Sequence, residues 1–236
     1  MKEISFDSKM YVKAVSVSVP IVYGEILPTA TFDLLVSNAA RVSVDGFTAE
    51  FTSRDAGLLR RLITDVHGSP FEHAVLGFQV EVPIFVERQW RTHRWSSFNE
   101  MSGRYSEMLP KGYVPDVLHK QIGTAMDYRR ESLEFTILDL SNIEAMYTES
   151  WKTYQTLLYN GVANEEARII LPVGMYTKFY WTANLRSIAN FLSLRTDVHA
   201  QLQIREAAAQ VEDIFRQYFP HIHDAWNEAG RKPLGA

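Results

Sequence analysis

The sequence predicts an α+β fold, with an antiparallel or mixed sheet flanked by helices and a C-terminal half that is mainly helical. Two observations predict the sheet. Residues 11–19 and 75–82 alternate apolar and polar side chains, and residues 175–182 are rich in aromatic and β-branched side chains. A third observation predicts the helices, because capping residues and amphipathic runs recur along the chain after residue 140.

In the N-terminal half, the predicted elements are a strand over 11–19, a helix over 31–40, a helix over 53–66, a strand over 75–82 and a helix over roughly 84–92. Thr31 and Ser53 are the expected N-caps, because a side-chain oxygen can satisfy the first N–H groups of a helix. Gly68 and Pro70 stop the second helix, and Pro83 suits the first turn of the third.

In the C-terminal half, the predicted elements are helices over 141–159, 165–171, 185–194 and 198–218, and a strand over 175–182. Ser141 and Glu144 match a capping box, Asn164 and Asn184 are expected N-caps, and Pro220 is expected to end the last helix. Residues 108–140 carry weak signals, so no element is predicted there.

Composition limits what the protein can do. With 236 residues, 46% of them hydrophobic, no repeat and no linker, the chain is predicted to form a single domain over residues 1–236. A net charge of -4 gives no general basic field, so nucleic acid is not an expected partner. No membrane segment is expected, since no apolar run approaches the length of a span.

The chain contains no cysteine, which excludes disulfides, thiolate metal sites and cysteine nucleophiles, and suits a cytoplasmic protein. His67 and His73 stand six residues apart with no acidic run nearby, so no metal site is expected. Glycine-rich phosphate loops are absent. A nucleotide cofactor would therefore not be held in the Rossmann manner.

Residues 89–105 (QWRTHRWSSFNEMSGRY) give the strongest functional signal. Arginine and histidine alternate there with hydroxyl and amide side chains, and arginine can grip phosphate at two points. Gly103 lets the backbone approach a ligand closely. We therefore predict a binding loop for an anionic small molecule. Ser102 is expected to bind phosphate, because Glu100 and Arg104 replace the two glycines of a serine-nucleophile elbow.

A second cluster comprises Arg168, Arg186, Asn190, Arg195 and His199. Arg186 and Asn190 share one face of a predicted helix. Surface salt bridges are the alternative explanation, and such pairs contribute little to stability. However, Arg186 and Arg195 lie in segments rich in Leu, Ile and Phe, where charge is costly unless it serves a ligand or a partner.

Together these segments resemble the flavin-dependent thymidylate synthases. The family signature is Arg-His-Arg followed at fixed spacing by Ser, Asn, Ser and Arg. Here Thr92-His93-Arg94 is followed by Ser97, Asn99, Ser102 and Arg104. The resemblance extends in order through the segments 40–43, 69–73, 83–86, 166–172 and 190–201. One departure is that Thr92 stands at the first Arg of the signature, with Arg91 one position earlier.

The resemblance implies reductive methylation of dUMP to dTMP by a methyltransferase of nucleotide biosynthesis. Methylenetetrahydrofolate would supply the carbon and NADPH the reducing equivalents, while FAD relays the hydride. The lack of cysteine agrees with this, since no thiolate is available to attack the pyrimidine ring. The family also implies a homotetramer whose active sites are shared between subunits.

Site residues follow from matching positions in the family. For dUMP these are Gln89, Glu100, Ser102, Gly103, Arg104, Arg168 and Arg195. For FAD they are Ser69, Thr92, His93, Arg94, Glu100, Asn184, Arg186 and Asn190, with Ser43 and His67 as weaker candidates. Arg104 would face the phosphate, and Arg195 is the expected catalytic residue, which polarises the uracil ring.

Two other functions remain open from the sequence. The first is a non-catalytic relative that binds nucleotides, motivated by a flavin site weakened at Thr92. The second is a nucleic-acid binder that uses the arginine clusters, against which the net charge of -4 argues.

Overall fold

The computed structural model describes residues 2–22, 25–26, 32–44, 46–124, 129–133 and 137–235. Its contacts divide the chain into two compact units. Unit 1 comprises Met1–Met10, Glu81–Gln89 and Glu100–Phe179, and unit 2 comprises Tyr11–Val80, Trp90–Asn99 and Tyr180–Ala236. Each unit is built from several separate stretches of chain. The prediction of a single domain stays a prediction.

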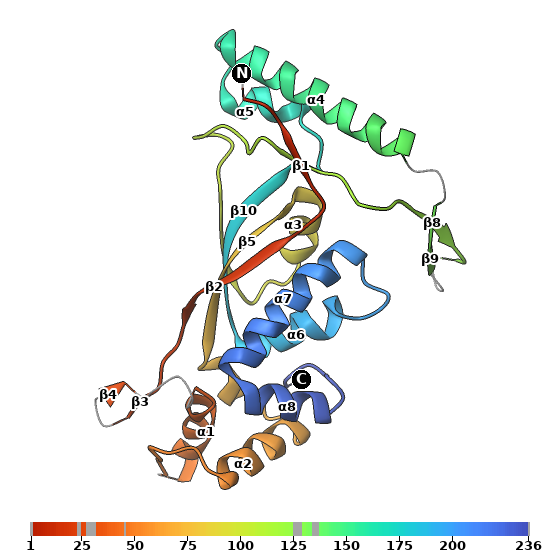
Figure 1. The fold of residues 1–236 in the computed structure, drawn as a ribbon. Helices are drawn as coiled ribbons and strands as arrows, with labels where there is room; N and C mark the ends of the chain where they lie inside the picture. The colour runs from red at the N-terminus through yellow and green to blue at the C-terminus, as the bar shows by residue number, and fades with distance from the viewer. Residues whose placement is uncertain are drawn as a thin grey trace. The chain divides into compact units, whose positions relative to one another are not determined.

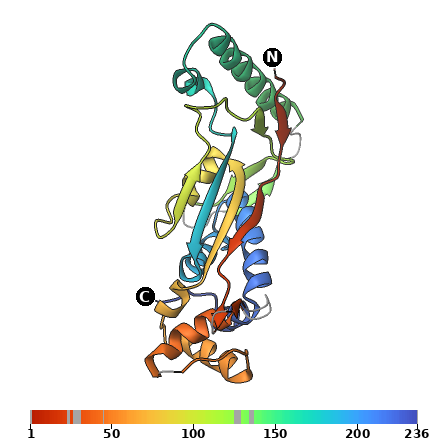
Figure 2. The same ribbon diagram turned by 90° about the vertical axis from the view of Figure 1, so that its left-hand side faces the viewer.

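The largest sheet among the described residues has four strands, in the order β2 (Tyr11–Val17), β5 (Val75–Pro83), β10 (Tyr176–Asn184) and β6 (Ser97–Glu100). Figure 2 shows β5 and β10 side by side, in yellow and cyan. The backbone N–H of Ser18 donates to the carbonyl of Val75 at 2.9 Å, just beyond β2. The three strand predictions are confirmed, with ends shifted by one or two residues.

Helices of unit 2 pack against one another and on β2. They are α1 (Leu34–Arg41), α2 (Ser53–Thr64), α6 (Leu185–Arg195), α7 (Leu202–Tyr218) and α8 (Pro220–Glu228), with the 3₁₀ turns η2 (Val42–Val44) and η3 (Ser69–Glu72). The short strands β3 (Ile21–Val22) and β4 (Glu25–Ile26) pair antiparallel. Helix α2 packs on α8, α6 on α7, and α7 on β2 (Figure 1).

Aromatic side chains fill the core of unit 2. Trp181 lies at its centre, with ring centroids 5.1 Å from Phe78, 5.2 Å from Trp90 and 5.1 Å from Phe191. All four side chains are almost fully buried, and edge-to-face and offset contacts of this kind add to the stabilisation from area burial. This cluster fixes the end of α3 and the middle of α6, which both carry candidate site residues.

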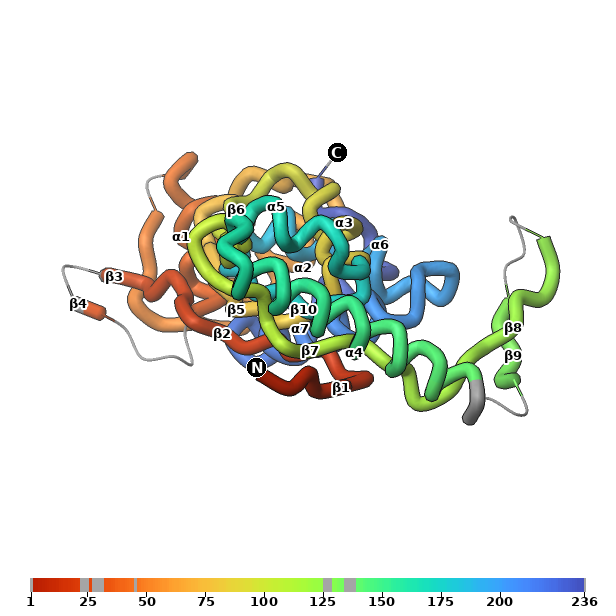
Figure 3. The backbone as a smooth tube through the Cα atoms, turned by 90° about the horizontal axis from the view of Figure 1, so that it is seen from above, coloured from red at the N-terminus to blue at the C-terminus, as the bar shows by residue number. Residues whose placement is uncertain are grey.

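Unit 1 contains the remaining elements. They are β1 (Ser5–Asp7), which pairs parallel with β7 (Lys111–Tyr113); β8 (His119–Ile122), which pairs antiparallel with β9 (Arg129–Ser132); α3 (Ile84–Trp90, of which Trp90 belongs to unit 2); α4 (Ile137–Tyr159); α5 (Asn164–Ala167); and the 3₁₀ turn η4 (Arg168–Ile170). Figure 3 shows the β8–β9 hairpin and the long helix α4 from above. The hairpin and β7 lie within residues 108–140, where the sequence predicted no element.

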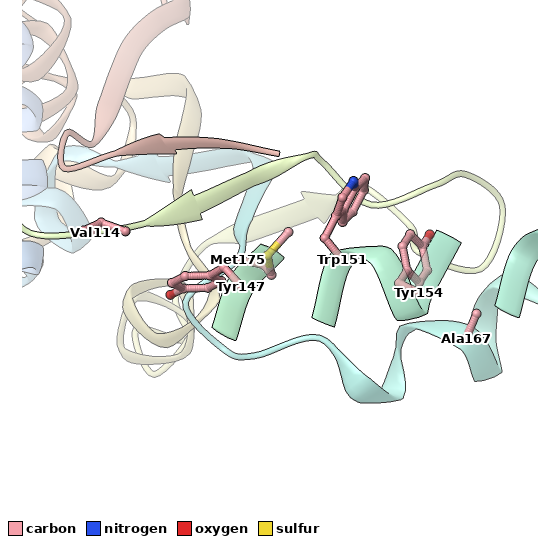
Figure 4. Close-up of a cluster of buried hydrophobic side chains, with 6 residues drawn as sticks. All are labelled: Val114, Tyr147, Trp151, Tyr154, Ala167 and Met175. Atoms are coloured by element: carbon pink, nitrogen blue, oxygen red, sulfur yellow. The ribbon is translucent and has the colours of Figure 1, made fainter. Parts of the chain in front are cut away.

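A separate apolar cluster stabilises unit 1. Figure 4 shows its buried members, which are Val114, Tyr147, Trp151, Tyr154, Ala167 and Met175. Two polar groups on these side chains have hydrogen-bond partners. The Trp151 indole N–H donates to the Lys2 carbonyl at 2.8 Å, and the Tyr154 hydroxyl accepts from the Met108 N–H at 3.1 Å. The cluster therefore joins α4 to the segment that follows the signature.

Several predicted helix ends were wrong. Thr52, not Ser53, is the N-cap of α2, and the Asp55 carboxylate accepts from the backbone N–H and the hydroxyl of Thr52 at 2.8 and 2.7 Å. Because Thr52 makes these two hydrogen bonds with Asp55, the helix is capped at Thr52 rather than at Ser53. The helix ends at Thr64, and Val66 adopts a φ of 59°. Thr31 lies outside the described residues, and α1 begins after Asp33.

Corrections also apply to the C-terminal half. Helix α4 already begins at Ile137, so the Ser141–Glu144 pair lies inside the helix rather than at its start. Asn164 is the first residue of α5, and Ala163 is its N-cap. Helix α7 starts at Leu202, later than expected, and Pro220 opens α8 in the position where proline suits a first turn. Pro83 is the last residue of β5. The α+β fold and the helical C-terminal half are confirmed.

None of the helices formed by described residues is both long enough and apolar enough to cross a membrane. Within the same residues, no three His, Asp or Glu side chains gather as a metal site requires.

Candidate functional site

A cavity of about 610 Å³ in unit 2 collects most of the residues expected to bind FAD. Its walls come from the signature segment, from α6 and the residue before it, and from residues 233–235. The lining side chains are Glu72, His93, Arg94, Trp95, Ser96, Trp181, Asn184, Arg186, Ser187, Asn190, Pro233, Leu234 and Gly235.

The signature enters this cavity because α3 ends at a fully buried tryptophan. The backbone N–H of His93 donates to the Trp90 carbonyl at 3.0 Å, which turns the chain immediately after the helix. The Ser96 hydroxyl donates to the His93 carbonyl at 2.8 Å and closes a second turn. Since Trp90 is fixed in the aromatic core, His93 and Arg94 are presented from a rigid base.

Helix α6 and the residue before it supply further residues that line the cavity. Asn184 caps the helix by accepting from the backbone N–H of Ser187 at 2.9 Å, as the sequence predicted. Leu185 and Ile188 are fully buried, so Arg186 and Asn190, one turn apart, are turned towards the cavity. The Arg186 guanidinium also pairs with the Glu72 carboxylate of η3.

Arg195, at the end of α6, contacts two successive residues of the signature. Its Nε donates to His93 Nε2 at 3.0 Å, and one terminal nitrogen donates to the Thr92 hydroxyl at 3.1 Å. Burial, and then the charge of Arg195, lower the pKa of His93 to about 4. The imidazole is therefore neutral near pH 7, with Nε2 as acceptor and the proton on Nδ1.

A group of residues expected to bind dUMP gathers in unit 1. Gly103 is buried against Arg168, since a Cβ at Gly103 would lie 3.0 Å from Arg168 Cδ and 2.6 Å from Met108 Sδ. The Ser102 hydroxyl accepts from the Arg104 backbone N–H at 3.2 Å. The exposed Arg104 side chain pairs with Glu165 at 2.7 Å. Two guanidinium groups thus flank a tight turn, an arrangement suited to an anion.

Glu100 and Gln89 belong to the same unit. The Glu100 carboxylate accepts from the hydroxyl of the buried Thr177 at 2.6 Å, which fixes it at the end of β6. Gln89 lies in the last turn of α3 and is half-buried. The expectation that Glu100 contacts FAD stays a prediction.

The two expected sets are thus placed as follows. His93, Arg94, Asn184, Arg186 and Asn190 line one cavity. Ser69 lines a second cavity of about 600 Å³, with Ser43, His67 and Arg186 also in its wall. Arg195 lies in unit 2 beside Thr92 and His93, whereas the other residues expected to bind dUMP are in unit 1.

Some lining residues were missed from the sequence. Glu72 lies within the segment 69–73, which resembles the family, but its ion pair with Arg186 is visible only in the structure. Trp95 is 86% exposed, which is unusual for tryptophan and signals a surface made for contact. Residues 233–235 carry no motif, and only the folded chain shows that they form a wall of the cavity.

The lining suits a flavin nucleotide. Arg94 and Arg186 offer donors for phosphates, and Trp95 offers an exposed aromatic face for a ring. In the described part of the chain, the indole N–H of Trp181 is buried without a hydrogen-bond partner. Cations, amides and an aromatic face line one cavity, a combination typical of a cofactor site.

Comparison with known proteins places the chain in a family. The family model described as "Thymidylate synthase complementing protein" matches residues 26–221. The flavin-dependent thymidylate synthase of Thermosipho africanus is 43% identical over 198 residues, which cover 82% of this chain and 86% of that protein. The protein of the same name from Thermotoga neapolitana is 40% identical over 202 residues, which cover 86% and 89%.

Solved structures agree with the sequence relatives. A UMP/dUMP methylase, PolB from Streptomyces cacaoi, bound with 5-Br UMP, is 36% identical, with a TM-score of 0.83. The match covers 98% of this chain and 100% of that one. The same protein bound with 5-Br dUMP gives a TM-score of 0.84 at 35% identity. The chain is therefore an enzyme that belongs to the flavin-dependent thymidylate synthase family.

Proposed function

We propose that this enzyme converts dUMP to dTMP by reductive methylation, with methylenetetrahydrofolate as carbon donor, NADPH as reductant and FAD as cofactor. The observation that carries the proposal is the unit 2 cavity, where five of the residues expected to bind FAD meet. When bound, FAD would supply the redox chemistry, so the protein must bind, orient and polarise its substrates. The names of the family relatives support flavin dependence.

The protein itself would contribute to the reaction mainly through its arginine side chains. Arg195 would donate hydrogen bonds to the uracil carbonyl region and stabilise negative charge as the ring becomes nucleophilic. Ser102, Gly103, Arg104 and Arg168 would hold the phosphate of dUMP. Because the chain has no cysteine, no thiolate can bond to the pyrimidine, and activation must come from charge and positioning.

Turnover provides the test. Purified protein supplied with FAD, dUMP, methylenetetrahydrofolate and NADPH is expected to form dTMP, which chromatography and mass spectrometry detect. Omitting each component in turn identifies which are required. Flavin-loaded protein that binds dUMP and forms no dTMP would instead support the non-catalytic alternative.

UMP is a second candidate substrate. The observation in its favour is that PolB, which matches almost the whole chain, is named a UMP/dUMP methylase and has been solved bound with 5-Br UMP as well as with 5-Br dUMP. Parallel reactions with dUMP and UMP at equal concentration give the ratio of their kcat/KM values. Methylated UMP would extend the substrate range, and a ratio above about a thousandfold for dUMP would exclude UMP as a physiological substrate.

We further propose a homotetramer with shared active sites. Exposed apolar side chains support an assembly, since Trp95, Leu194 and Val198 in unit 2 are 86%, 54% and 66% exposed. Light scattering coupled to size exclusion is expected to give four times the chain mass of 27.1 kDa. A monomer at micromolar concentration would contradict this proposal.

A further inference from the structure

We infer that Thr92 and His93 act as positioning residues, which hold the Arg195 guanidinium by accepting two of its hydrogen bonds. The inference rests on the proposed function, because that function places Arg195 against the pyrimidine ring. It assigns Thr92 a role that differs from the cationic flavin contact expected at this position of the signature.

The geometry is that of a two-point clamp. Arg195 donates through Nε to His93 at 3.0 Å and through a terminal nitrogen to Thr92 at 3.1 Å. A guanidinium group is planar and rigid, so hydrogen bonds on two different nitrogens fix both its position and the orientation of its plane. Neighbouring residues supply the two acceptors, and one short segment therefore aims the cation.

An arginine in place of Thr92 could not fill this role. Arginine has five donors and no acceptor, and it would place a second cation beside Arg195. Threonine replaces that cation with a hydroxyl that can accept. Arg91, one position earlier, places its guanidinium over the Phe98 ring, 5.4 Å from the ring centroid.

His93 can accept only while its imidazole is neutral, and its surroundings keep it so. Burial and the charge of Arg195 lower its pKa to about 4. The ring also packs edge-on against Phe191, with centroids 5.0 Å apart, and Phe191 lies one turn before Arg195 on α6. The acceptor and the donor are thus both anchored to the same helix.

Isosteric variants test the role of Thr92. Thr92→Val keeps the branched shape and removes the acceptor. Losing one charge-assisted hydrogen bond is expected to lower kcat about ten- to a hundredfold, with FAD affinity changed less than about threefold. Thr92→Ser keeps the hydroxyl and is expected to recover kcat to within about threefold. Thr64→Val, at the exposed end of α2 in the same unit, is the matched control.

Two further measurements separate positioning from a general structural effect. If Thr92 acts through Arg195, then Thr92→Val should not weaken dUMP binding further once Arg195→Ala is present. In ¹⁵N-edited NMR, the resonance of the Arg195 Nη–H that donates to Thr92 should be protected from exchange in the wild type and in Thr92→Ser. In Thr92→Val it should be lost or exchange at least about tenfold faster.

Each outcome has one meaning. An unchanged Arg195 resonance and an unchanged kcat in Thr92→Val would overturn the inference while leaving the proposed function intact. If the wild type forms no dTMP, the proposed function fails. The NMR comparison still decides whether Thr92 and His93 hold Arg195, and loss of protection in Thr92→Val alone would support it.

Discussion

Arg195 is the residue on which the proposed chemistry depends most. It is half-buried, desolvation lowers its pKa, and two signature residues accept its hydrogen bonds. Arg195→Ala is expected to lower dTMP formation at least about a hundredfold, because a preorganised donor at the developing charge is lost. Flavin should remain bound, since the cavity lining does not include Arg195. Turnover in Arg195→Ala close to the wild-type rate would remove the role assigned to this residue.

A second residue, Asp33, governs stability rather than chemistry. It is 1% exposed, and burial raises its pKa to about 6 although its carboxylate accepts from the backbone N–H groups of Ile222 and His221 at 3.0 and 3.3 Å. His221 lowers this pKa and Asp224 raises it, both by smaller amounts than burial. A carboxyl with a raised pKa holds its proton more tightly in the folded state than in the unfolded one. Its contribution to stability is therefore present below about pH 4 and is lost as pH rises towards 6.

Asp33→Asn removes this titration. The free energy of unfolding of the variant, relative to the wild type, should rise by up to about 3 kcal/mol between pH 4 and pH 7. The constant cost of a weaker cap on α8 does not affect this trend. Urea denaturation at several pH values measures it. A difference that is flat with pH, or that falls, would contradict the assignment of the raised pKa to Asp33.

Among the elements, the segment at residues 233–235 contributes to the site although nothing in the sequence predicted it. Leu234 is 2% exposed, and the segment lies so close to Gly68 that a Cβ there would come within 2.7 Å of the Leu234 carbonyl. The Trp226 indole donates to the Lys232 carbonyl at 2.6 Å and anchors the chain just before it. Gly68 has an ordinary helical φ of -78°, so alanine strains no backbone angle there. Its Cβ would press on this segment and would also lie 3.0 Å from Arg186 Nε.

Gly68→Ala is expected to displace the segment from the cavity wall and to weaken FAD binding at least about fivefold, by loss of lining contacts. Gly57→Ala in α2 is the matched control, because a Cβ there meets no atom within 4 Å. Fluorescence titration with FAD compares the two variants. Equal FAD affinity for Gly68→Ala and Gly57→Ala would show that residues 233–235 do not help to hold the cofactor.

Elements whose signals are local could be predicted from the sequence. The strands followed from alternation over a few residues, and Asn184 caps α6 through a residue only three positions ahead. Distant contacts could not be predicted. Asp33 caps α8 from almost the other end of the sequence, and Glu72 meets Arg186 only in the fold. Thr52 and Ser53 are neighbouring candidates for the N-cap of α2, and the structure shows that Thr52 is the cap. Alternation and composition cannot distinguish between two such neighbours.

On the scale of the whole molecule, most residues expected to bind FAD lie in unit 2, and the residues expected to bind dUMP, apart from Arg195, lie in unit 1. Unit 2 holds the cavity with five of the residues expected to bind FAD, and unit 1 holds the turn around Gly103. The family resemblance named these residues by matching positions, and the signature itself carries His93, Arg94 and Ser102 at fixed spacing. The tryptophans and the 233–235 wall had to come from the structure, since packing rather than sequence spacing brings them to the cavity.

The proposed chemistry depends most directly on the cavity of unit 2 as the site of the flavin. The decisive measurement is a titration of the cofactor-free protein with FAD, followed by flavin fluorescence and visible absorption, in the wild type, Arg186→Ala and Arg60→Ala. Arg60 is an exposed arginine of the same unit that pairs with Glu228, and it serves as the matched control. We expect saturable binding by the wild type and Arg60→Ala, and binding at least about tenfold weaker in Arg186→Ala. A wild-type protein that remains colourless and does not bind FAD would contradict the assignment of this cavity to the flavin.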